Sequence, residues 1–119
     1  MADPVTVSKS AFYSVKPNTP VQLSITIGDG QVGGTDVRIG GAQIGSGDIT
    51  NLPIGAAAQD LKTKSIDCIT TVQRQNAATG HTSVTYSLRG GMQDRDFTYE
   101  ATVNQIGDRA VYEISFVFA

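Results

Sequence analysis

The stretch VQLSITIGDGQVGGTDVRIGG, residues 21–41, contains the spacing G-x-G-x-x-G at Gly28, Gly30 and Gly33. In dinucleotide-binding proteins this spacing ends a strand and begins a helix whose N-terminus meets the pyrophosphate. The residues after Gly33 are further glycines and β-branched residues, which oppose a helix. Because no helix can begin there, the spacing lacks its chemical mechanism. We therefore expect no cofactor, and interpret these glycines as a turn between strands.

The same region holds most of the residues that we consider as ligand contacts. Eight of the thirteen glycines lie between residues 28 and 47, and glycine lets a ligand or a partner strand approach the backbone closely. Calcium needs six to eight oxygen ligands, and the spacing of Asp29, Asp36 and Asp48 fits neither an EF-hand loop nor a nonapeptide calcium-binding repeat. The alternative function that we keep is a small lectin-like module, binding a carbohydrate or calcium through loops 28–48. Its candidate residues are Asp29, Asp36, Arg38 and Asp48.

Side chains for catalysis are few. Cys68 and His81 are the only residues of their types, and a nucleophilic pair would need them adjacent, with an acid to orient the base. Cys68 follows the core-facing alternation of its segment, where an inert buried thiol is usual. Asp94 and Asp96 flank Arg95, but nothing marks an opposing carboxylate across a cleft. We assign no catalytic residue and no metal ligand, and expect that the protein is not an enzyme.

Composition excludes several classes of function. The nine Lys and Arg residues are scattered and the net charge is -2, so no basic patch is present to bind a nucleic acid. No segment has the apolar length of a membrane helix. No signal peptide is visible at the N-terminus, which predicts a cytoplasmic protein or one exported by a route without such a signal. A signal peptide already removed would leave the same sequence.

The dominant pattern along the chain is the alternation of apolar and polar residues, which is typical of half-buried β-strands. The expected strands lie in PVTVSKSAFYSV, VQLSITI, TDVRIGGAQIG (two short arms), SIDCITTVQRQ, TSVTYSLRG, DFTYEATVN and AVYEISFVF. Lys9 interrupts the first of them, which predicts a bulge near residues 8–10. Glycine pairs and the segment 106–109 predict turns that close hairpins.

These elements predict the fold class. Seven or eight strands at regular spacing indicate an all-β protein, an antiparallel β-sandwich or small barrel, with at most one short helix near residues 55–62. The length of 119 residues predicts a single domain over residues 1–119.

A surplus of apolar side chains on the outer faces carries our functional prediction. Val111 and Val117 face away from Phe116 and Phe118, and Ile69 points outward from its own strand. A sheet wetted on one side does not need such residues, so they suggest a contact with another subunit. We expect a non-enzymatic structural or interaction protein that self-associates as a homo-oligomer. Binding of a small molecule or glycan belongs to the alternative.

Overall fold

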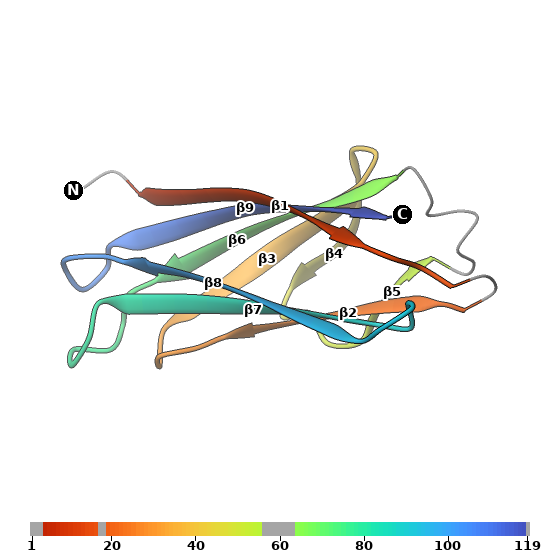
Figure 1. Ribbon diagram of the computed structural model, residues 1–119. Coiled ribbons are helices and arrows are strands. Elements are labelled where there is room, and N and C mark those ends of the chain that lie inside the picture. Colours follow the sequence, from red (N-terminus) through yellow and green to blue (C-terminus); the bar gives the residue numbers. More distant parts are fainter. Residues whose placement is uncertain (1–3, 17–18, 56–63, 119) are drawn as a thin grey trace.

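Two β-sheets packed face to face form the protein, as the computed structural model shows for residues 4–16, 19–55 and 64–118 (Figure 1). The first sheet has five strands in the order β1-β9-β6-β3-β4, and the second has four in the order β5-β2-β7-β8. The strands are β1 (Val5–Tyr13), β2 (Val21–Ile27), β3 (Val32–Ile39), β4 (Ala42–Gly47), β5 (Leu52–Gly55), β6 (Ser65–Gln73), β7 (His81–Arg89), β8 (Arg95–Thr102) and β9 (Arg109–Phe118). The predicted all-β class is confirmed, and the two sheets form a sandwich and not a closed barrel.

The strand inventory differs from the prediction in three ways. There are nine strands, because the four residues of β5, which include Pro53, also pair with β2. The first sheet is mixed, because β1 runs parallel to β9. The predicted bulge near residues 8–10 is wrong, since the β1–β9 register is continuous from Val5 to Tyr13. The predicted short helix near 55–62 falls almost entirely outside the described residues; Gly55 ends β5.

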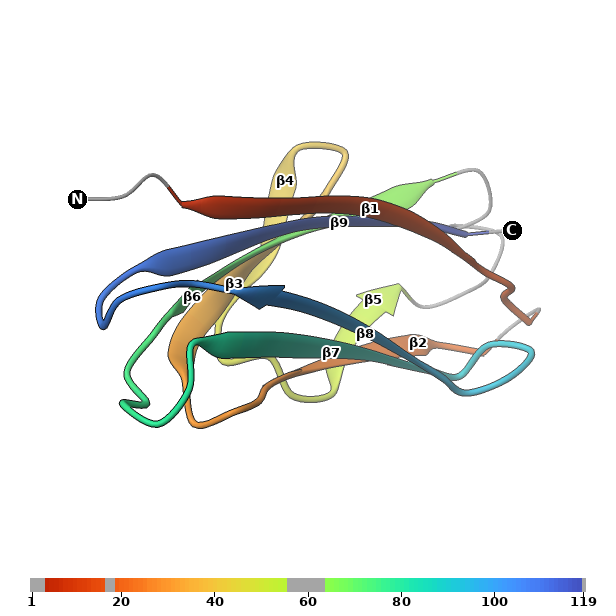
Figure 2. The same ribbon diagram turned by 60° about the vertical axis from the view of Figure 1, so that its left-hand side comes forward.

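Most connections cross from one sheet to the other. Among the described strands, β3–β4 and β7–β8 are hairpins, and the first turns at Gly40 and Gly41, both with positive φ. Segment 106–109 was predicted to close a hairpin and does not, because β8 and β9 lie in different sheets. Figure 2 shows the resulting sandwich from a second side, with β1 and β9 in one layer and β7 and β8 in the other.

The core lies between the sheets and follows the predicted alternation. Its largest side chains are fully buried aromatic and aliphatic groups from both sheets, among them Tyr13, Tyr86, Tyr112, Phe116, Phe118, Leu23 and Ile114. Three of these are tyrosines, whose hydroxyls need partners when they are buried. Tyr86 hydrogen-bonds Thr70 at 2.6 Å, and Thr70 hydrogen-bonds Thr35 at 2.8 Å. Every buried side-chain nitrogen or oxygen in the described part of the chain has a hydrogen-bond partner.

Candidate functional site

The outer face of the five-stranded sheet carries the three residues predicted to form a subunit contact. All three point outward as expected: Ile69 is 43% exposed, and Val111 and Val117 are half-buried. On β9, Glu113 and Ser115 separate the two valines on the same face. Ile69 pairs with Glu113 in the β6–β9 register, which makes it a diagonal neighbour of Val111 and leaves Val117 apart. The structure therefore does not bring the three together in one patch.

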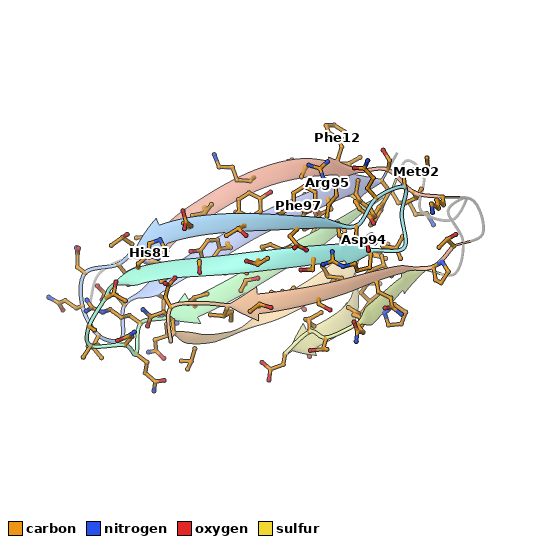
Figure 3. All side chains as sticks on the ribbon, turned by 60° about the horizontal axis from the view of Figure 1, so that its bottom comes forward. Phe12, His81, Met92, Asp94, Arg95 and Phe97 are labelled. Atoms are coloured by element: carbon orange, nitrogen blue, oxygen red, sulfur yellow. The ribbon has the colours of Figure 1, made fainter. Side chains whose placement is uncertain are left out.

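Phe12 is the outward apolar residue that sequence reasoning missed. It lies beside Val117 in the β1–β9 register, and its side chain is 70% exposed, the largest exposure of a large hydrophobic residue in the described chain. The alternation could have revealed it, because Ala11 and Tyr13 on either side of Phe12 face inward. We call Phe12 and Val117 the end patch, and Figure 3 shows Phe12 projecting from β1 near one end of the molecule.

Further side chains gather at the same end. Met92 is 58% exposed, and its backbone N–H donates to the carbonyl of Ser14 just beyond the end of β1. The guanidinium of Arg95 lies 4.9 Å from the centre of the Phe97 ring. Phe12, Met92 and Arg95 thus lie toward one end, and His81 lies at the other (Figure 3).

Asp94 and Asp96 both face one cation. Arg89 on β7 lies 2.8 Å from Asp96 and 3.9 Å from Asp94. The hydrogen bond from Arg89, followed by that from Ser87, holds the pKa of Asp96 below its usual value. Both carboxylates therefore lie on the exposed surface at or beside the β7–β8 turn, where they form ion pairs with Arg89.

Asp36 and Arg38 form an ion pair on β3, on the outer face of the five-stranded sheet. Arg38 donates from Nε to Oδ2 of Asp36 at 2.6 Å, and Gln43 on β4 donates to Oδ1 at 2.5 Å. The bond from Arg38 is the largest cause that lowers the pKa of Asp36. Asp36 is thus held by its own neighbours on β3 and β4.

The stability of the protein at acidic pH should depend on the ion pair between Asp36 and Arg38. A carboxyl whose pKa is lowered by folding stabilises the protein above its unfolded pKa, and this stabilisation is lost as the pH falls through the folded pKa. We expect Arg38→Gln to raise the pKa of Asp36 toward its ordinary value and to reduce this loss. An NMR titration of the Asp36 carboxyl carbon measures the first effect, and urea unfolding between pH 2 and 5 measures the second. An unchanged Asp36 titration in the variant would contradict the assignment.

The other two candidate ligand residues lie elsewhere. Asp29 has a φ of 62° in the turn between β2 and β3, where its Oδ2 accepts from Ser83 at 2.8 Å and lies 2.9 Å from Nδ1 of His81. Nε2 of His81 lies 3.5 Å from Glu100 on β8. Asp48 follows β4 and lines a hollow between β2 and β3. The four predicted ligand residues are therefore distributed over three places.

Cys68 and His81 are positioned by different sheets. Cys68 is fully buried on β6, and burial raises the pKa of its thiol to about 12, so the thiolate is scarce near neutral pH. The ring of His81 is partly exposed on β7, with Asp29 2.9 Å from Nδ1 and Glu100 3.5 Å from Nε2. Within the described residues, no group of three His, Cys, Asp or Glu side chains is placed to hold a metal ion. The same part of the chain contains no helix long and apolar enough to cross a membrane.

The fold defines the class of this protein as an all-β sandwich with one parallel strand pair at an edge. The sequence matches no protein-family model, and no curated protein and no solved structure is significantly similar to it.

Proposed function

We propose that the protein is a non-enzymatic subunit that self-associates through the end patch. The observation that supports this proposal is the exposure of Phe12, whose aromatic side chain stands 70% exposed beside Val117 on an otherwise polar strand face. The other residues on that face of β1 are Thr6, Ser8 and Ser10. Aromatic residues are enriched at the centres of protein interfaces because they bury a large area at a low cost in side-chain entropy.

The sheet edges favour association through this face over strand addition. The edge strand β5 has four residues and contains Pro53. At the edge strand β4, the register with β3 shifts between Val37 and Arg38. On the edge strand β1, Lys9 is paired with the buried residue Ile114. Paired residues share a face of the sheet, so the side chain of Lys9 points to the inner face. Short strands, proline, irregular register and inward-pointing lysine all oppose pairing with a further strand. The remaining edge strand, β8, contacts β1 along the same side of the sandwich.

A symmetric dimer would use the patch twice. In a two-fold interface the same surface appears on both subunits, so each subunit contributes one Phe12. Fully burying a phenylalanine side chain is worth roughly 1.5–3 kcal/mol, and about 1.4 kcal/mol corresponds to a tenfold change in affinity. Removing the aromatic ring should therefore weaken association at least tenfold.

Sedimentation velocity over a range of concentrations tests the proposal. We expect the natural protein to form a discrete oligomer, and expect both Phe12→Ser and Val117→Asp to shift it toward the monomer. Ile69→Ser is the matched control, because it removes another exposed apolar side chain from the same face but away from the end patch. Thermal unfolding of each variant establishes that the fold is retained.

Three results would contradict the proposal. The first is a natural protein that stays monomeric at the highest soluble concentration. The second is an oligomer that persists unchanged in the folded Phe12→Ser variant. The third is an equal effect of Ile69→Ser and Phe12→Ser, which would indicate nonspecific adhesion of apolar surface.

A further inference from the structure

We propose that a hollow between β2 and β3 binds a short extended peptide that carries a lysine or an arginine. This hollow, the β2–β3 slot, has a volume of about 450 Å³. Its wall includes Ile25, Ile27, Val32, Gly33, Gly47 and Asp48. The slot is independent of the end patch, so the inference does not rest on self-association.

The wall on β2 includes a backbone N–H, that of Ile27, with no described acceptor. The N–H of Ile25 donates to the carbonyl of Ile49 at 2.9 Å, and the N–H of Gly28 donates to Ser83 of β7 at 3.0 Å. Backbone N–H groups alternate sides along a strand, so the N–H of Ile27 points to the same side as that of Ile25. The pairing of β2 with β5 ends at Leu23, and no described residue accepts from Ile27 on that side. A bound strand can supply the missing partner.

The wall on β3 is open over a similar length. β3 pairs with β6 from Val32 onward, but its pairing with β4 begins only where Thr35 meets Gly47. The backbone of residues 32–34 therefore has a partner strand on one side alone. Gly47 has a φ of 80°, and a Cβ built on it would meet no atom within 4 Å, so this part of the wall is bare backbone facing open space. The glycine-rich stretch thus leaves backbone accessible at the slot.

The side chains of the slot define the chemistry of its occupant. Ile25 and Ile27 are half-buried and Val32 is 43% exposed, which provides apolar contact for alternate side chains of an extended peptide. Asp48 is the charged residue that lines the slot, and it forms no ion pair or hydrogen bond with any described residue. Because no described residue pairs with this carboxylate and the wall beside it is apolar, the slot favours a cationic side chain between two apolar ones.

One end of the slot is held rigidly by Gln31, which is 7% exposed. Its amide nitrogen donates to the carbonyls of Thr79 and His81, and its amide oxygen accepts from the N–H groups of Gln75 and Asn76. These bonds tie the residue before β3 to the β6–β7 connection and to the first residue of β7. A preformed wall lowers the ordering cost of binding.

Two end-blocked peptides test the proposal, Ac-Thr-Val-Lys-Val-Thr-NH2 and the same peptide with Glu in place of Lys. We expect the lysine peptide to shift the amide signals of Ile27, Val32, Gly33 and Asp48 in ¹H–¹⁵N NMR spectra, and to bind more tightly than the glutamate peptide. Asp48→Asn should weaken the lysine peptide about two- to fivefold, the range for an exposed ion pair, and leave the glutamate peptide no weaker.

Three N-methylated peptides and a control variant complete the experiment. N-methylation of the lysine residue, or of either neighbour, removes a peptide N–H that can donate to the backbone on the open side of residues 32–34, so at least one of the three peptides should bind more weakly than the parent. Asp94→Asn is the matched control, because it removes an exposed carboxylate at the other end of the molecule and should change nothing. No shifts at millimolar peptide, shifts centred away from the slot, or equal affinity of both charged peptides would each overturn the proposal.

Discussion

Phe116→Ala is expected to lower the free energy of unfolding by about 3–5 kcal/mol, the range for removing a large buried aromatic side chain. Phe116 lies on β9 and has no exposed surface. Its ring centre is 5.5 Å from that of Tyr86 and 5.1 Å from that of Phe97, both in the opposite sheet. The substitution removes the group that joins the two sheets at this point and leaves a cavity that neighbouring strands cannot fill without shifting.

Urea unfolding measures this loss, with a lower midpoint and an unchanged slope if the compactness of both states is retained. Phe12→Ala is the matched control, because it removes the same ring from the neighbouring strand at a position that is 70% exposed. At concentrations where the chain is monomeric, Phe12→Ala should change the free energy of unfolding by no more than roughly 0.5 kcal/mol. Equal costs for the two variants would contradict the assignment of Phe116 to the core and Phe12 to the surface.

Alternation was sufficient to predict the class of fold and the faces of its strands. The two-residue period of β6 predicts that Cys68 points inward and Ile69 points outward, and the structure confirms both orientations. Burial on one side of a strand is a local property, so each segment records it in its own sequence. The period does not record which strand lies alongside or in which direction, because parallel and antiparallel neighbours both accept alternating residues. The parallel pair β1–β9 was therefore missed.

The candidate site was predicted only in part for the same reason. That Val117 points outward was readable from β9 alone, but its neighbour Phe12 comes from the other end of the chain. The four polar residues of the glycine-rich stretch are close in sequence, yet crossing between the sheets places Asp29, Asp36 and Asp48 in three environments. Their hydrogen-bond partners, such as His81 for Asp29, are set by contacts between strands distant in sequence. No local pattern carries that information.

Gly90→Ala is expected to destabilise the protein by roughly 2–5 kcal/mol, because two costs combine. Gly90 has a φ of 93°, a conformation that costs an L-residue about 1–2 kcal/mol. A Cβ at this position would also overlap the carbonyl oxygen of Pro20, the residue immediately before β2. Backbone atoms cannot turn aside as a side chain can, so β7 and β2 would have to separate, at a further cost of roughly 1–3 kcal/mol.

Gly41→Ala separates the two costs. Gly41 has a φ of 84° in the β3–β4 turn, but a Cβ there would meet no atom within 4 Å. Gly41→Ala should therefore lower the free energy of unfolding only by the cost of the positive φ, about 1–2 kcal/mol. The difference between the two variants in urea unfolding then measures the steric cost of the contact between Gly90 and Pro20. If the two alanine variants were equally stable, β2 would not approach the β7–β8 turn this closely, and the β2–β7 register would need revision.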